Sequence, residues 1–292
     1  MNRLVHSYSK FLSAVTLVLI IAGGLVTSTE SGLSVPDWPL SYGQFFPPMV
    51  GGIRFEHTHR LIAGIVGILT FVLLGLLLKN EGRGWVKCLG AAAALAVVLQ
   101  AILGGLTVIY LLPTPVSVAH ACLGQTFFSL VVSLVLFTSK EWATAPKIAS
   151  ENSESLKRLL ATTFFFVCLQ LIAGSVVRHA HGRTLNLHAL LAFLIAIHVL
   201  FILVRILRDA DLQPLVNHVL LLTGLVTLQV FSGGGAYLLT LVIEKAAYPR
   251  TSEVLITTAH QSIGAVILAT TLLLMLRSFR LLKPTELRTS HE

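Results

Sequence analysis

Charged residues and cysteines are both scarce in this chain of 292 residues. Lys, Arg, Asp and Glu together make up 12% of the chain and hydrophobic residues make up 55%, so its mean hydropathy is +0.84. This composition excludes an ordinary soluble domain and indicates a polytopic membrane protein. The three cysteines, Cys88, Cys122 and Cys168, fall in or beside apolar stretches. They therefore offer neither a disulfide framework nor a cysteine-rich metal site.

Eight apolar stretches are long enough to cross a bilayer as helices, which takes about 20 residues each. They are roughly residues 11–28, 59–78, 88–111, 117–138, 158–177, 186–207, 215–241 and 256–276. The first of them is longer than the ~7–15 apolar residues of a secretory signal, so it is expected to be a retained first helix. Runs of this length also favour helices over a membrane barrel. The sequence thus predicts an all-α integral membrane protein with eight transmembrane helices.

The placement of the basic residues predicts the orientation of these helices. With the N-terminus inside, 15 of the 21 Lys and Arg residues fall on the inner side and 6 on the outer side. The inner ones are Arg3, Lys10, Lys79, Arg83, Lys87, Lys140, Lys147, Lys157, Arg158, Arg205, Arg208, Arg277, Arg280, Lys283 and Arg288, and the outer ones are Arg54, Arg60, Arg178, Arg183, Lys245 and Arg250. The positive-inside rule then places both termini in the cytoplasm of a cell-membrane protein. The net charge of +8 reflects this topology and anionic lipid, because no basic cluster interleaved with aromatic residues indicates nucleic-acid binding.

The two halves of the chain resemble each other. The phrase Leu99-Gln100-x-x-x-Gly104-Gly105 recurs as Leu228-Gln229-x-x-x-Gly233-Gly234, and a polar connection at about 139–157 separates the halves. Each half contains four apolar stretches, so the repeats are parallel in the membrane. We therefore expect two pseudo-repeated four-helix bundles, at residues 1–145 and 146–292.

Four histidines stand at the start of apolar stretches that run from outside to inside: His59, His120, His188 and His260. Polar side chains within a membrane are costly, so their repeated placement at one depth suggests a function. A single histidine of this kind would more often be a satisfied polar residue than a ligand. Four in register within a repeat favour axial ligands, and four imidazoles could hold two bis-histidine haems near the outer face.

Polar residues near the first of these histidines allow two interpretations. Glu56 precedes His59 by three residues, so both lie on one helical face if the helix begins early enough. The carboxylate could simply stabilise a helix N-terminus, or it could move a proton or stabilise developing positive charge. Arg60 could contact a haem propionate or be an interfacial cation. The loop residues His179 and His181 could likewise contact haem propionates, or they could simply be solvated.

Three segments carry a resemblance to the haem A synthase family. Glu56-His57-Thr58-His59-Arg60 resembles that family's Glu-x-x-His-Arg motif. Pro36-Asp37-Trp38-Pro39-Leu40 is similar to its first outer loop, and Gly23-Gly24-Leu25-Val26-Thr27-Ser28 to the end of its first helix. The first two motifs are specific, and the resemblance extends over nearly the whole chain.

The resemblance implies an oxidoreductase that converts a methyl group of haem O to the formyl group of haem A, with oxygen from water. It implies that the substrate haem binds between His59 and His120 and a haem b between His188 and His260, with Glu56 as the catalytic carboxylate. Haem O synthase and terminal oxidase assembly would be its partners, and no motif identifies the electron acceptor. Many family members carry two cysteines around the first-loop motif.

Val35 and Ser41 occupy the places of those two cysteines in this chain, which excludes thiol–disulfide chemistry in the loop. Two alternatives to the enzyme fit the four histidines equally well: a di-haem b cytochrome that only passes electrons, and a protein that transfers haem. Glu56 beside the first histidine, together with the loop motif, favours the enzyme.

Overall fold

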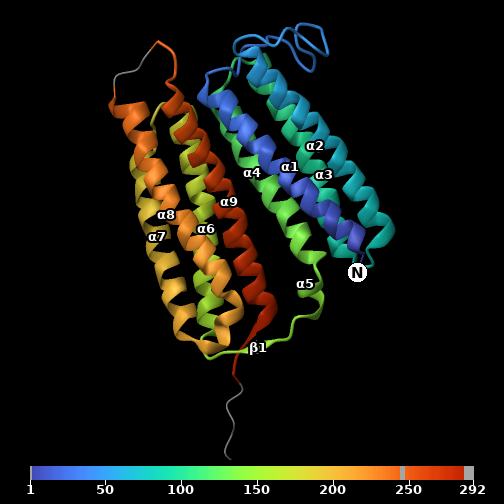
Figure 1. The fold of residues 1–292 in the computed structure, drawn as a ribbon, viewed down its shortest axis with the longest axis vertical. Coiled ribbons are helices and arrows are strands. Elements are labelled where there is room, and N and C mark those ends of the chain that lie inside the picture. The colour runs from blue at the N-terminus through green and yellow to red at the C-terminus, as the bar shows by residue number, and fades with distance from the viewer. Residues whose placement is uncertain (1, 244–246, 286–292) are drawn as a thin grey trace, which may run out of the picture.

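A computed structural model describes residues 2–243 and 247–285 of the chain (Figure 1). Its elements in chain order are α1 (Arg3–Ser28), α2 (Ile53–Asn80), α3 (Gly84–Ile109), α4 (Thr114–Phe137), α5 (Lys140–Thr144), β1 (Ile148–Ala149), α6 (Ser153–His179), α7 (Leu185–Arg208), the 3-10 helix η1 (Ala210–Leu215), α8 (Val216–Tyr237), the π-helix η2 (Leu238–Val242), α9 (Thr251–Leu281) and β2 (Leu282–Lys283). Within the described residues, eight helical segments are long and apolar enough to span a membrane, with η1, α8 and η2 counted as one. The prediction of an all-α, eight-helix membrane protein is therefore confirmed.

The helices begin earlier than the apolar stretches that predicted them. α1 begins at Arg3 rather than near residue 11. The Asn2 side chain caps this start by accepting a hydrogen bond from the Leu4 N–H (2.9 Å). α2 begins at Ile53 rather than near residue 59. Hydropathy locates the apolar centre of a spanning helix, whereas the backbone hydrogen bonds continue through polar turns at its ends. One consequence is that Glu56 lies in the first turn of α2.

The eight long helices form two groups of four (Figure 1). In the first group α1 packs against α2 and α4, and α3 against α2 and α4. Its core includes Leu12, Leu73 and Leu134, all buried. In the second group α6 packs against α7 and α9, and α8 against α7 and α9, around a core that includes Ile202 and Leu222. Each group thus buries an apolar core of its own.

Two kinds of contact join the groups where α1 and α4 meet α9. A small apolar cluster of Ile20, Phe128, Ala265 and Ala269 lies at this interface, where the alanines allow close approach of the backbones. Nearer the first loop, the Ser28 hydroxyl of α1 accepts hydrogen bonds from three side chains of the second group. Its partners are Arg178 (3.1 Å), Thr257 (2.8 Å) and Thr258 (3.1 Å).

The two ends of the molecule differ in their connections. The start of α1, α5 and β1 lie at one end, and the long first loop (residues 29–52) lies at the other (Figure 1). β1 pairs in parallel with β2, with Ile148 opposite Leu282, so the connection between the groups is held to the segment after α9. The first loop contains no helix, in keeping with its prolines and glycines. Lys245, Arg288 and His291 lie outside the described residues.

Candidate functional site

Each of the four predicted histidines packs against a glycine of the long helix before it. A Cβ built on the glycine would come close to the imidazole Cε1 in every case. The pairs are Gly23 with His59 (3.0 Å), Gly104 with His120 (3.2 Å), Gly174 with His188 (2.8 Å) and Gly233 with His260 (2.9 Å). In all four pairs Nδ1 is nearer the glycine than Nε2. Because glycine has no side chain, each imidazole can lie against the neighbouring helix. In all four pairs the edge formed by Cε1 and Nδ1 is the one nearest that helix.

The residue four positions before each glycine also contacts the histidine. This residue is glutamine in three pairs and Leu19 in the first pair. Gln170 Nε2 lies 3.5 Å from His188 Nε2, and Gln229 Nε2 lies 3.3 Å from its histidine Nε2. Gln100 Nε2 instead donates to the His120 backbone oxygen at 2.9 Å. The repeated Leu-Gln phrase of the sequence therefore belongs to the surroundings of the histidines.

His188 and His260 face each other across the second group of helices. Their ring centroids are 6.2 Å apart and the ring planes are inclined by 71°. An imidazole nitrogen lies about 2 Å from a bound metal ion, so two rings that share one ion have centroids about 6 Å apart. The spacing therefore fits one iron ion. Ser232 Oγ lies 3.1 Å from His260 Nδ1, a contact that fixes ring orientation and that the sequence did not indicate.

In the first group, His59 and His120 are close enough to interact electrostatically. Both Nδ1 atoms are buried without a hydrogen-bond partner among the described residues. In the described part of the chain, no group of three or more His, Cys, Asp or Glu side chains is arranged for a metal ion. Two imidazoles are the donor set of a bis-histidine haem, and whether each pair of histidines binds one stays a prediction.

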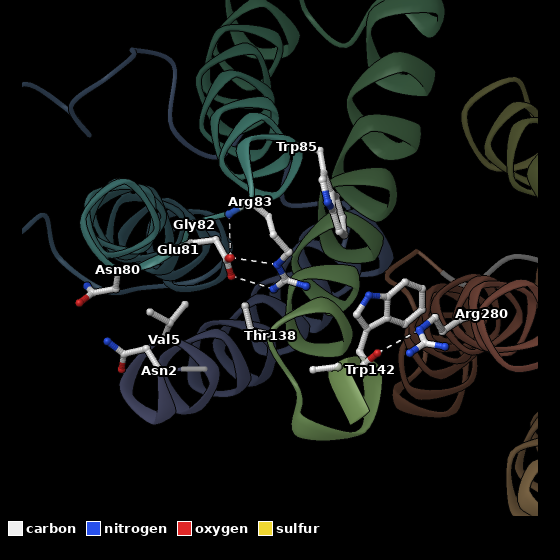
Figure 2. A pocket seen from close by; sticks show the side chains of 11 residues that line it. Asn2, Val5, Asn80, Glu81, Gly82, Arg83, Trp85, Thr138, Trp142 and Arg280 are labelled. Carbon is white, nitrogen blue, oxygen red and sulfur yellow. Dashed lines mark hydrogen bonds and ion pairs between the residues drawn. The ribbon is translucent and has the colours of Figure 1, made fainter. Parts of the chain in front are cut away.

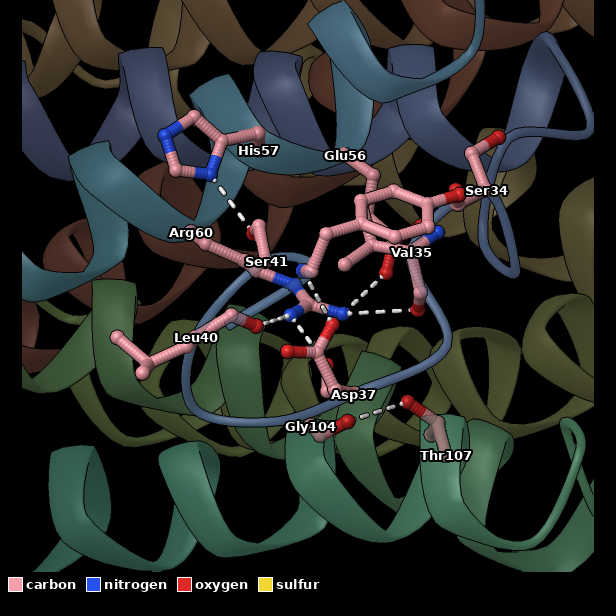
Figure 3. Close-up of polar contacts among 11 residues, drawn as sticks. Ser34, Val35, Asp37, Leu40, Ser41, Glu56, His57, Arg60, Gly104 and Thr107 are labelled. Atoms are coloured by element: carbon pink, nitrogen blue, oxygen red, sulfur yellow. Dashed lines mark hydrogen bonds and ion pairs between the residues drawn. The ribbon is translucent and has the colours of Figure 1, made fainter. Parts of the chain in front are cut away.

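Glu56, buried one turn before His59, forms an ion pair with the half-buried Arg60 (Figure 3). Glu56 is 3% exposed, and its Oε1 lies 2.5 Å from the Arg60 guanidinium. Its Oε2 accepts a hydrogen bond from the Val35 N–H at 2.9 Å. The carboxylate is thus held on one side by its own helix and on the other by the first loop.

The guanidinium of Arg60 also holds the first loop against the start of α2. It donates to the backbone oxygens of Asp37 (2.6 Å), Leu40 (2.7 Å) and Val35 (3.3 Å), as Figure 3 shows. Hydrogen bonds from the N–H groups of Gly43 and then Tyr42 lower the pKa of Asp37, against a smaller opposing effect of desolvation. The terminal nitrogens of Arg60 are directed to protein acceptors, and its contact with a propionate stays a prediction.

Sequence reasoning missed the role of His57. Its Nδ1 lies 2.8 Å from Ser41 Oγ, both side chains are buried, and this contact fastens the loop to α2 a second time. The signal was present in the doubled histidine of the Glu56–Arg60 motif. Val35 and Ser41, at the predicted cysteine places, both hold the loop through hydrogen bonds. The Trp38 ring of the first loop packs against α3 at Gly105, where a Cβ would lie 2.8 Å from the ring.

The remaining histidines have other surroundings. His179 interacts electrostatically with His120, and its backbone oxygen accepts a hydrogen bond from the Thr114 hydroxyl at 3.2 Å. His198 Nδ1 lies 2.8 Å from the Leu194 backbone oxygen, and its ring packs edge-on against Phe166. His198 is therefore satisfied by contacts within its own helix and with α6.

Comparison with known proteins completes the description of the site. The sequence model of the cytochrome oxidase assembly protein family (COX15-CtaA) matches residues 7–51 and 53–187, and so ends one residue before His188. A "Heme A synthase" of Exiguobacterium sibiricum is 27% identical over 184 residues, which are 61% of each chain. A "Heme A synthase" of Bacillus pumilus is 30% identical over 183 residues, 58% of each chain. The matched segments thus span about three fifths of these relatives' length. Because the family model covers more than half of the 292 residues, the chain belongs to the cytochrome oxidase assembly protein family.

Proposed function

We propose that this protein is a haem A synthase, an enzyme that oxidises a methyl substituent of haem O to the formyl group of haem A. The observation that carries the proposal is the buried Glu56 carboxylate one turn before His59, whose imidazole lies against Gly23 of α1. The relatives named "Heme A synthase" support it. A pair of histidines alone would hold a haem, whereas an ionisable group beside the pair can take part in a reaction.

The reaction removes protons as well as electrons from the substrate. Converting a methyl group and one water molecule to a formyl group releases four protons and four electrons. His59 and His120 would hold the iron of the substrate haem and orient its rim, and Glu56 would accept protons or stabilise positive charge next to the ring. Arg60 keeps this carboxylate in place and holds the first loop beside it. The electrons would pass to an external acceptor.

The second half would hold a resident haem b between His188 and His260. Their ring spacing of 6.2 Å and the contact of Ser232 with one of them fit that group. A bis-histidine haem b supplies one-electron transfer. We accordingly propose residues 1–145 as the substrate half and residues 146–292 as the electron-transfer half. Replacing His188 with Ala should abolish the haem b spectrum while the protein remains inserted.

A di-haem b cytochrome is the second candidate, and the equivalence of the four glycine–histidine contacts favours it. If both pairs hold haem in the same way, the protein would only pass electrons. The enzyme, in contrast, would act in the cell membrane with the histidines toward the outer face, between a haem O synthase and the assembly of a terminal oxidase.

Pigment analysis separates the two candidates. The full chain is produced in cells that make haem O, and the extracted haems are separated by chromatography. The enzyme predicts haem A or haem O beside haem B, whereas haem B alone would support the cytochrome.

A variant pair then tests Glu56 itself. Glu56→Gln should retain haem b yet lose haem A output at least about a hundredfold, the typical effect of a catalytic carboxylate. Ser41→Ala is the control, because it releases the other anchor of the loop without touching the carboxylate. Near-normal output from Glu56→Gln would limit the carboxylate to a role at the helix start. Equal losses in both variants would limit it to holding the loop.

A further inference from the structure

A cavity of about 670 Å³ lies between α6 and α7 at the end of the molecule opposite the first loop. The start of α6 contributes Ser155 and Arg158, and the end of α7 contributes Arg205 and Arg208. Arg205 and Arg208 are three residues apart and therefore lie on one face of their helix. Three guanidinium groups from two helices thus line one space.

In the described part of the chain, none of these three cations forms an ion pair. Among the residues that the structure describes, neither Arg158 nor Arg208 has an ion-pair or hydrogen-bond partner, and Arg205 donates to the Ser155 hydroxyl at 2.5 Å. No described carboxylate lines the cavity. The neighbouring Asp209 carboxylate accepts hydrogen bonds from Ser150 (2.8 Å) and Asn152 (3.2 Å) instead.

A second cavity at the same end shows the contrast (Figure 2). It measures about 510 Å³ and is also lined by two arginines. Here Arg83 pairs with Glu81 at 2.7 Å, and the hydrogen bond from Arg83 is the main reason that the pKa of Glu81 falls to about 2. Arg280 donates to the Trp142 backbone oxygen at 3.1 Å. These cations are satisfied within the protein, whereas those between α6 and α7 are available to an anion from outside.

The wall of the α6–α7 cavity changes from charged to apolar toward the middle of the helices. Phe201 and Val204 precede Arg205 and Arg208 by one helical turn, and Leu159 follows Arg158. Phe201 is 60% exposed on the outside of the helix bundle, in a segment long and apolar enough to span a membrane. The cavity is therefore basic at the end of the bundle and continues into an apolar, membrane-facing groove.

We propose that this cavity binds an anionic phospholipid, with its phosphate among the three arginines and an acyl chain along Phe201 and Val204. Guanidinium groups bind phosphate oxygens through paired hydrogen bonds, and basic pockets between membrane helices bind anionic head groups. A choline head group would bring a fourth positive charge toward the three arginines, none of which forms an ion pair among the described residues. A soluble phosphate would satisfy the arginines but leave the apolar wall unused.

Native mass spectrometry of the full-length protein in detergent tests the proposal. Phosphatidylglycerol should remain bound at least about tenfold more strongly than phosphatidylcholine. The variant R158Q/R205Q/R208Q should lose this preference. The control R3Q/K10Q/K79Q removes the same number of positive charges from the same end of the other helix group and should keep it. Arg208→Gln alone, at an exposed position, should weaken binding severalfold without a risk to folding.

Three results would overturn the proposal. Equal losses in the two triple variants would reduce the effect to general surface charge. Equal retention of the two lipids would remove the head-group preference. Glycerol phosphate binding as tightly as phosphatidylglycerol would mean that the cavity serves a soluble phosphate.

Discussion

At the residue scale, the missing side chains of four glycines govern the histidines. Each glycine lets an imidazole lie against a neighbouring helix at a distance where a Cβ would collide or press. Glycine normally weakens a helix interior relative to alanine by roughly 1 kcal/mol, so these positions carry a cost in helix stability. The cost is offset where the glycine positions a ligand.

A pair of adjacent glycines makes this testable. Gly233→Ala should displace the His260 ring and reduce the haem retained after purification, because the new Cβ would lie 2.9 Å from Cε1. Gly234→Ala is the matched control, since a Cβ there meets no atom within 4 Å. It should leave haem content unchanged and slightly raise thermal stability. Haem per protein, measured as the pyridine haemochrome, distinguishes them, and equal content would contradict the positioning role.

At the element scale, the first loop is ordered by α2 rather than by its own secondary structure. Three residues of α2 hold it: Arg60 through three backbone oxygens, His57 through the Ser41 hydroxyl and Glu56 through the Val35 N–H. Arg60 and Glu56 are four residues apart on the helix, so the ion pair and the loop contacts share one guanidinium. The loop, the carboxylate and His59 are therefore parts of one unit.

Removing the guanidinium should release the loop. Hydrogen bonds to a charged group contribute about 1.5–3 kcal/mol, so Arg60→Ala should raise amide exchange in residues 34–45 tenfold or more. Arg54→Ala, an exposed change one and a half turns earlier in α2, is the control and should leave exchange unchanged. Hydrogen–deuterium exchange of the protein in nanodiscs measures both. Unchanged protection in the Arg60 variant would show that other contacts order the loop.

At the scale of the whole molecule, two four-helix groups meet along α9. The apolar cluster around Ala265 and the hydrogen bonds at Ser28 join them, so both histidine pairs belong to one body of packed helices. The first loop and α5 lie at opposite ends of this body (Figure 1). Its orientation in the membrane stays a prediction, which rests on the excess of basic residues at the α5 end.

Cysteine labelling tests that orientation. Gln44 in the first loop and Glu151 before α6 are both exposed, whereas Ser41 and Ser153 are buried and would react poorly. Each site is changed to cysteine in a background without Cys88, Cys122 and Cys168. A membrane-impermeant maleimide applied to intact cells should label Gln44→Cys alone. Labelling of the Glu151 variant instead would reverse the topology and move the histidines to the inner face.

The sequence by itself determined the eight spanning helices and placed the four histidines near the starts of α2, α4, α7 and α9. It also determined that Glu56, His59 and Arg60 lie within two consecutive turns of one helix. These features depend on local quantities, namely the length of apolar runs and the period of the helix, which a chain carries without reference to its fold. The structure adds that α2 begins at Ile53, before the predicted apolar stretch, so that Glu56 lies within the helix.

Only the tertiary structure decided which groups satisfy one another. The glycine beneath each imidazole, the Val35 N–H on Glu56 and the Ser41 contact of His57 join residues from different elements. So does the pairing of β1 with β2. Such contacts depend on how each helix is rotated about its axis, and on the need of every buried polar group for a partner. Both are set by the packing of all the helices together, so hydropathy along the chain could not reveal them.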